Sequence, residues 1–369
     1  MGTGNKDEAR GATVSRKAKR LNRMGSLAHR WLTTLLGLAL SVAAMAQNGP
    51  FRDPSKHKIQ FVTVQADVRL EVLDWGGSGR PVVLLAGLGN SAHVFDDFAE
   101  HLSDFCHVYG ITRRGYGTSD QPDSGYDEQR LADDVLAVLE SLQLTAPVLM
   151  GHSIGGDELT AIGAQRSDRI AGLVYLDATA DPRDDFTEFN SRIQQLPAAI
   201  RSLPEWSGGL RAGSVADRSS FAAYRRWLQD RNGVEWPEAE LRNLYEANED
   251  GSVGRYKTPK ATADAILAGG RIRDYSNIHV PILAFSWFPP SVAERMKKYP
   301  PTDAEGVAKV AAVREVELKL SRRRIRSLFS ADAPVHVIDM PGANHFLFIS
   351  DEAFVLSEVR AFLKRLPLD

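Results

Sequence analysis

The sequence predicts an α/β domain in which buried parallel strands alternate with helices and a helical segment is inserted between two strands. Two observations predict the core: short runs of consecutive apolar residues, typical of strands buried on both faces, alternate with amphipathic helical patterns. A third predicts the insertion. Between residues 181 and 277 the chain becomes helical and aromatic, and proline and glycine interrupt it repeatedly.

The N-terminus has the pattern of a signal peptide over residues 1–46. Basic residues precede an apolar run at 31–46, which ends in Ala44-Met45-Ala46. Small residues at those spacings fit the cleavage rule, so we expect cleavage after Ala46 and export to the periplasm or the exterior. The alternative is an uncleaved signal that anchors the chain in a membrane.

Two further features of this segment bear on that expectation. The apolar run is shorter than the roughly 20 residues of a membrane span, so we expect no stable span after signal removal. The basic head is long, and the sequence fits a start at either Met1 or Met24.

The charge balance argues against a nucleic-acid partner. The whole chain has a formal charge of −2, and without residues 1–46 it keeps 37 basic and 45 acidic side chains, a charge of about −8. The basic cluster at 322–326 is expected to be a solvated helix face. The single cysteine, Cys106, cannot form an intrachain disulfide. No Cys/His pattern has zinc spacing, so we expect neither a metal nor a cofactor.

The predicted elements follow the chain in order. A polar, proline-containing linker is expected at 47–58. The first part of the core is expected at 59–180, the helical cap at 181–278 and the second part of the core at 279–369. Strands are expected at 59–64, 68–75, 81–85, 106–111, 148–150, 170–177, 280–285 and 335–338, and helices at 94–102, 128–142, 157–166, 304–328 and 351–366.

The patterns of single segments justify these assignments. Residues 68–75 alternate apolar with charged positions, as in a strand buried on one face, whereas 81–85 are apolar throughout, as in a central strand. The loop at 113–119 contains two arginines and two glycines, and we expect it to be structural, anchored by an arginine. The cap aromatics are expected mostly to form the core of the cap itself, with a few facing an apolar pocket.

The central feature is Gly151-His152-Ser153-Ile154-Gly155. An apolar strand precedes it and a helical pattern follows, the order that a nucleophile elbow requires. Glycine on both sides of Ser153 leaves room for a sharply bent backbone. The helix then directs its free amides and its positive dipole end toward Ser153.

A second glycine-rich corner follows the apolar strand at 81–85. It reads Gly87-Leu88-Gly89, and glycines there allow backbone amides to approach a ligand closely. The amides of Leu88 and Ile154 are the candidate donors of an oxyanion hole. Gly87, His93 and His152 are candidate residues of the substrate pocket.

Together these motifs resemble those of the α/β-hydrolase superfamily. The resemblance spans residues 59–366 and includes the corner at 86–91, the Arg-Gly-x-Gly-x-Ser loop at 114–119, the elbow, and Gly-Ala-Asn-His at 342–345. It implies a mostly parallel eight-stranded sheet flanked by helices, with a cap between the sixth and seventh strands. The chain is most similar to esterase-like members with a serine nucleophile.

The resemblance also implies the catalytic roles. Ser153 is the expected nucleophile and His345, after the last strand, the general base. Most members carry the acid after the seventh strand, where this chain has Ser286-Trp287-Phe288 and no carboxylate. Some carry it after the sixth strand, so we expect Asp177, with Asp303 as the alternative.

The expected reaction is hydrolysis of a carboxylic ester with a small to medium, partly apolar acyl group. Amides, lactones and carbon–carbon bonds suit the same residues, whereas epoxide hydrolysis and dehalogenation need an aspartate at position 153. The alternative function is that of a non-catalytic small-ligand-binding protein on the same fold. The sequence does not determine the substrate or the oligomeric state.

Overall fold

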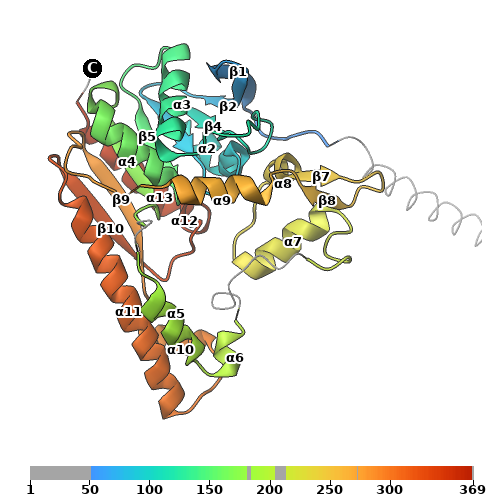
Figure 1. Cartoon of the computed structure of the whole chain (residues 1–369), viewed down its shortest axis with the longest axis vertical. Coiled ribbons are helices and arrows are strands. Elements are labelled where there is room, and N and C mark those ends of the chain that lie inside the picture. The colour runs from blue at the N-terminus through green and yellow to red at the C-terminus, as the bar shows by residue number, and fades with distance from the viewer. Residues whose placement is uncertain (1–50, 181–183, 204–212, 272, 368–369) are drawn as a thin grey trace, which may run out of the picture. The chain divides into compact units, whose positions relative to one another are not determined.

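An eight-stranded sheet, in the order β1-β2-β4-β3-β5-β6-β9-β10, organises the computed structural model of the chain (Figure 1). Its strands are β1 (Lys58–Gln65), β2 (Val68–Gly76), β3 (Pro81–Leu85), β4 (His107–Ile111), β5 (Val148–His152), β6 (Gly172–Leu176), β9 (Ile282–Phe288) and β10 (Val335–Pro341). The pairs β1–β2 and β2–β4 are antiparallel and all others are parallel. The predicted fold class is therefore confirmed.

The structure describes residues 51–180, 184–203, 213–271 and 273–367. The predicted signal peptide and the start of the predicted linker lie outside these residues. Residues from Asp53 to the C-terminus form one unit, to which all that follows refers. In the described ranges, no helix is both long and apolar enough to cross a membrane.

Helices cover both faces of the sheet, which explains the uninterrupted apolar strands. Val82 and Leu84 of β3 pack into one core cluster, and Val83 and Leu85 pack into the other. The first cluster is closed by η1 (Ala92–Phe95), α2 (Asp96–Leu102), α12 (Leu347–Ser350) and α13 (Glu352–Arg365), and the second by α3 (Glu128–Ser141), α4 (Gly155–Arg166) and the C-terminal end of α11 (Ala304–Leu328). The short 3₁₀ helix η2 (Ser167–Arg169) connects α4 to β6.

The chain between β6 and β9 forms two packed parts. It contains α5 (Thr187–Gln194), α6 (Ala198–Arg201), α7 (Phe221–Asn232), α8 (Glu238–Leu244), β7 (Tyr245–Ala247), β8 (Val253–Tyr256) and α9 (Lys260–Gly269). The sequence predicted only helices here, but β7 and β8 form a hairpin whose turn is closed by Gly251, with φ +80°, donating to the carbonyl of Asn248. Aromatic residues of α7 pack with Leu241 of α8 and Tyr245 of the hairpin in one cluster.

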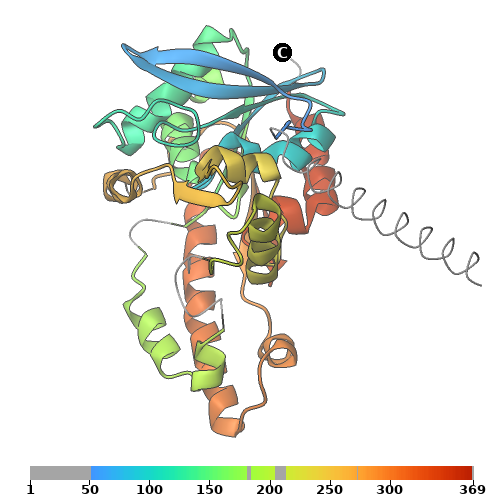
Figure 2. The same cartoon turned by 90° about the vertical axis from the view of Figure 1, so that its right-hand side faces the viewer.

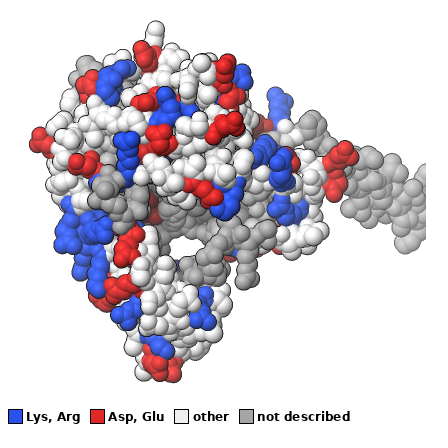
Figure 3. Space-filling model, in the orientation of Figure 1, with Lys and Arg blue, Asp and Glu red and all other residues white. Residues whose placement is uncertain are grey.

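The other part joins segments from both sides of β9. Leu196 and Ile200 of the inserted chain pack with Val310 and Val313 of α11 and with residues of α10 (Val292–Lys298). Figures 1 and 2 both show α5, α6 and α10 beside the N-terminal half of α11. Acidic and basic side chains are interspersed over the face shown in Figure 3. In the basic cluster on α11, Arg323 and Arg324 pair with Asp184.

Candidate active site

Ser153 lies at the sharp turn between β5 and α4, with a backbone φ of +53°. A non-glycine residue with positive φ is strained, and such strain is typical of a functional turn. The flanking glycines make the turn possible. A Cβ on Gly151 would lie 2.8 Å from the carbonyl oxygen of Gly155, and one on Gly155 would lie 2.7 Å from that of Leu85. The sequence pattern of the elbow therefore has a direct steric cause.

Asp177 directly follows β6 and is held in place by the neighbouring strand β9. Its backbone φ is +44°, and its N–H donates to the carbonyl of Phe285 at 2.9 Å. One carboxylate oxygen accepts from the backbone N–H of Trp287 at 3.1 Å. The other lies 2.7 Å from Nδ1 of His345, so the carboxylate fixes the orientation of that imidazole.

Asp303 has a different position and a different task. It is the N-cap residue of α11, and its side chain accepts a hydrogen bond from the N–H of Gly306 at 2.8 Å. Asp177 is therefore the carboxylate that meets His345. The end of β9 supplies no carboxylate of its own. Instead, the backbone N–H of Trp287 in this strand orients the carboxylate of Asp177.

The Ser153 hydroxyl and Nε2 of His345 are both unpaired in the described chain and form no hydrogen bond with each other. The His345 side chain is 49% exposed. The ring of His152, next to Ser153 in the chain, lies 4.5 Å from the ring of His345 and donates from Nε2 to the His345 carbonyl at 3.0 Å. Ser153, Asp177 and His345 all follow the carboxyl ends of parallel strands.

His152 is a buried neighbour of the site and does not line an open pocket. Its pKa is lowered well below 6.5, first by burial and then by the proximity of His345, so the ring is neutral. Its Nδ1 has no hydrogen-bond partner. That atom faces Gly87, where an added Cβ would lie 2.8 Å from Nδ1 of His152 and 3.2 Å from Cβ of Ser153. Gly87 is thus a glycine because the elbow lies against it.

The amides of Leu88 and Ile154 are available for an anion. Neither N–H has a hydrogen-bond partner within the described chain, whereas the N–H of Ser153 donates to Leu176. The side chains of Leu88 and Ile154 pack against the same small cluster around Tyr116 and Tyr126. The corner and the elbow are therefore neighbours.

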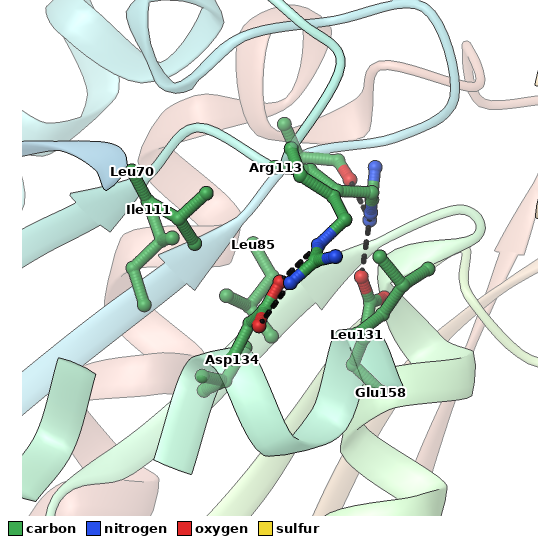
Figure 4. A pocket seen from close by; sticks show the side chains of 10 residues that line it. Leu70, Leu85, Ile111, Arg113, Leu131, Asp134 and Glu158 are labelled. Carbon is green, nitrogen blue, oxygen red and sulfur yellow. Dashed lines mark hydrogen bonds and ion pairs between the residues drawn. The ribbon is translucent and has the colours of Figure 1, made fainter. Parts of the chain in front are cut away.

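Arg113 connects the corner to the elbow helix (Figure 4). Its Nε donates to Glu158 of α4 at 2.6 Å, and its guanidinium also donates to the carbonyl of Ala86 at 2.9 Å. Both charged side chains are buried, beside a cavity of about 10 Å³, about the room for one water. The sequence indicated an anchoring arginine in this loop but not its partners, which are distant in the chain.

The inserted segment holds the other side of the corner. The carboxylate of Glu240, on α8, accepts from the side-chain amide of Asn90 and the backbone N–H of Ser91 at 2.8 and 3.1 Å. Tyr256 donates to the carbonyl of Gly89 at 2.9 Å. Burial raises the pKa of Glu240 to about 7, although the donors from Ser91 and Asn90 oppose that shift. No sequence motif marks Glu240 or Tyr256, so their contacts with the corner could not be predicted from the sequence.

The cap also reaches the loop that carries His345. The indole of Trp236 lies 5.2 Å from the ring of Phe346, and the side-chain amide of Asn344 donates to the carbonyl of Asn232. The indole N–H of Trp236 is buried without a partner. Most other cap aromatics pack with one another. In the described aromatic contacts, Trp236 is the cap residue that touches the loop carrying His345.

His93, a candidate pocket residue in the sequence, lies in a separate buried cluster. Its Nδ1 is 3.2 Å from Asp96 and its Nε2 is 3.5 Å from Glu71. Burial lowers the pKa of His93, but hydrogen bonds to Asp96 and Glu71 outweigh it and raise the pKa to about 10. Both ring nitrogens face carboxylates, so His93 presents no free nitrogen to a substrate.

Ser153, the His345–Asp177 pair and the two unpaired amides follow the carboxyl ends of strands in one sheet. Residues 82–358 match the model of the alpha/beta hydrolase family. The chain belongs to this family, and its relatives support a hydrolase enzyme.

Individual relatives match over short stretches. The chain is 30% identical over 103 residues to 2-(acetamidomethylene)succinate hydrolase of Mesorhizobium japonicum, covering 28% of this chain and 37% of that protein. It is 38% identical over 120 residues to a non-heme chloroperoxidase of Streptomyces lividans, covering 32% and 44%. The chain thus matches less than half the length of each of these curated relatives.

Solved structures match over most of the chain. E-2-(acetamidomethylene)succinate hydrolase aligns with 84% of this chain and 99% of its own, with a TM-score of 0.54 and 20% identity. An esterase from Rhodococcus sp. ECU1013 aligns with 84% and 99%, with a TM-score of 0.52 and 21% identity. At this level of identity the similarity concerns the fold.

Proposed function

We propose that the protein is a serine hydrolase that cleaves a carboxylic ester, or a related acyl bond, of a small to medium and partly apolar substrate. The observation that carries the proposal is the hydrogen bond of 2.7 Å between His345 Nδ1 and Asp177, together with the strained elbow position of Ser153. A carboxylate on Nδ1 directs the lone pair of the neutral imidazole to Nε2, where a base is needed.

In the proposed reaction the Ser153 oxygen attacks the substrate carbonyl carbon while Nε2 of His345 takes the hydroxyl proton. The resulting oxyanion accepts hydrogen bonds from the amides of Leu88 and Ile154. When the carbon–oxygen bond to the leaving alcohol breaks, the imidazolium returns the proton to that alcohol, which leaves an acyl-enzyme. Water, deprotonated by His345, then attacks the acyl carbon. The bond between that carbon and the Ser153 oxygen breaks, the imidazolium returns the proton to Ser153, and the carboxylic acid leaves.

Ester rather than amide cleavage is the preferred assignment because an alcohol leaves more easily than an amine. Similar proteins include both an esterase and a hydrolase of an acetamido compound, and this supports acyl chemistry in general. The indole of Trp236 lies beside the loop that carries His345, which favours a substrate with an apolar part. We also propose that residues 1–46 direct export and are removed.

A fluorophosphonate probe tests the nucleophile. The protein should be labelled, and Ser153→Ala should remove the label, whereas Ser330→Ala, an exposed serine at the end of α11, should keep it. Turnover of p-nitrophenyl esters of rising chain length then defines the acyl class. A folded protein that is neither labelled nor active on any ester would refute the proposal and favour a small-ligand-binding protein.

A further inference from the structure

Four side chains from two distant segments meet in a buried cluster away from the serine. Asp53 and His57 precede β1, while His93 and Asp96 lie in η1 and at the start of α2. Each offers one ligand atom, and these atoms lie within 4.8 Å of one another. The side chains of His57, His93 and Asp96 are at most 4% exposed, and that of Asp53 is 26% exposed. Asp53 is therefore the member of the cluster that contacts solvent most.

The distances among facing atoms fit a single small cation. Oδ2 of Asp53 lies 3.6 Å from Nε2 of His57 and 3.7 Å from Nδ1 of His93. Oδ2 of Asp96 lies 3.2 Å from Nδ1 of His93. In a tetrahedral site with metal–ligand bonds of about 2.0–2.1 Å, neighbouring ligand atoms are about 3.3–3.4 Å apart. These three distances are thus within about 0.4 Å of that spacing, and all four ligand atoms lie within 4.8 Å of one another.

The remaining atoms of these side chains already have partners. Oδ1 of Asp53 accepts from the N–H of Ser55 at 2.9 Å. Oδ1 of Asp96 accepts from the indole of Trp75 at 3.2 Å and lies 2.9 Å from Nδ1 of His57. Nε2 of His93 lies 3.5 Å from Glu71. This arrangement, in which a carboxylate supports the outer nitrogen of a ligand histidine, is typical of metal sites.

The charge of the cluster is also suitable. In the described part of the chain, no lysine or arginine forms an ion pair with Asp53 or Asp96. Two imidazoles with two carboxylates form a donor set that suits Zn²⁺ and similar divalent transition metals better than Ca²⁺ or Mg²⁺, which prefer oxygen alone. The sequence shows no Cys/His pattern with zinc spacing, whereas these four residues form the patterns Asp-x-x-x-His and His-x-x-Asp, which do not by themselves indicate a metal.

We propose that Asp53, His57, His93 and Asp96 bind one divalent transition-metal ion of the Zn²⁺ class. The ion attaches the segment before β1 to η1, which follows directly on the corner loop at 87–91. Its role is to stabilise this side of the fold, and it takes no part in the acyl transfer. The proposal is independent of the proposed function.

The test uses the full-length protein, stripped with a chelator and titrated with Zn²⁺ in a calorimeter. We expect one ion per chain and a higher Tm, because an ion that binds the folded chain stabilises it. Asp53→Asn and His57→Gln should each weaken binding by roughly 100-fold or more. Trp75→Phe, which removes only a supporting donor, should weaken it by about 10–100-fold. His101→Gln, on the exposed face of α2, is the matched control and should bind like the wild type.

A second measurement on the wild type does not depend on variants that fold. Co²⁺ added to the stripped protein should give the intense visible absorption of a tetrahedral nitrogen–oxygen site, and Zn²⁺ should abolish it. Ser153→Ala should bind the metal unchanged, which separates this result from the esterase test. Substoichiometric binding with no change of Tm, or equal binding by Asp53→Asn and the wild type, would overturn the proposal.

Discussion

The molecule contains two histidine–carboxylate arrangements that differ in what they leave free. At the first, His345 has one nitrogen on Asp177, while its other nitrogen has no partner in the described chain and its side chain is half exposed. At the second, His93 is buried and both of its nitrogens face carboxylates. A general base needs one free nitrogen and a route for substrate, whereas a buried histidine that stabilises the fold needs no such route. The two arrangements therefore contain the same residue types but differ in whether a histidine nitrogen is left free.

The corner loop connects the two arrangements. Gly87 contacts the elbow, Asn90 and Ser91 are held by Glu240 of the inserted segment, and His93 follows two residues later in the buried cluster. Changes on this loop should therefore affect activity at one end and stability at the other. Four expected outcomes, in order of decreasing size, test that division.

Replacing Asp177, the carboxylate that pairs with His345, should have the largest effect on kcat. Asp177→Asn should lower kcat by about 10⁴-fold because the amide no longer holds the productive tautomer of His345. Asp303→Asn is the matched control, since it alters only a helix cap and should cost less than about 1 kcal/mol of stability with kcat unchanged. Steady-state kinetics with a p-nitrophenyl ester measure both. If Asp177→Asn keeps nearly wild-type activity, the pair of Asp177 and His345 is not catalytic.

Crowding the elbow should have the next largest effect. In Gly87→Ala the added methyl would lie 2.8 Å from His152 Nδ1 and 3.2 Å from Ser153 Cβ, so the serine or the imidazole must shift. A displacement of about 1 Å at the reacting atoms costs on the order of 10²-fold in kcat. Gly251→Ala, whose φ is +80° with open space around it, controls for backbone strain alone. Equal kcat values for the two variants would contradict the steric argument.

The attachment of the inserted segment should depend on pH. The pKa of Glu240 is raised from its ordinary 4.5 to about 7, so the folded chain binds this proton more tightly than the unfolded chain. The stabilisation is complete below about pH 4.5 and is lost as the pH rises toward 7, at up to about 1.4 kcal/mol per pH unit.

Glu240→Gln should remove that contribution to the pH dependence of Tm between pH 5 and 8. Glu238→Gln, on the same helix but partly exposed and paired with Arg242, is the matched control and should retain it. A wild-type Tm that rises over this pH range, with no difference in Glu240→Gln, would refute the assignment.

The smallest effect is expected for a change beside the cluster of Asp53, His57, His93 and Asp96, and it concerns the free energy of unfolding. Trp75→Phe removes the indole donor to Asp96 while the carboxylate keeps its two histidine neighbours. The loss should be about 1.5 kcal/mol, the typical value of one hydrogen bond to a charged group. Denaturant unfolding of the chelator-treated protein measures it, and the midpoint should move while the slope stays constant. No change in the midpoint would mean that the indole does not support the cluster.

Much of the core could be predicted because its signals are local. Apolar runs identified all eight strands of the sheet, and the elbow glycines marked a turn that no other residue could form. The β7–β8 hairpin was missed because it is short and lies in an aromatic segment that resembles a helical one. The packing of α5 and α6 against α11 could not be foreseen either, because it depends on contacts across more than 100 residues of chain.

The sequence by itself determined the α/β architecture and the elbow at Ser153, because strand burial and steric demands at a tight turn are imposed on neighbouring residues. Only the tertiary structure decided that Asp177 and not Asp303 meets His345, that Glu240 holds the corner, and that His93 joins Asp53 and His57 rather than the substrate side. The physical reason is that the partner of a charged group depends on where strands and helices end in space. Separation along the chain does not encode that distance.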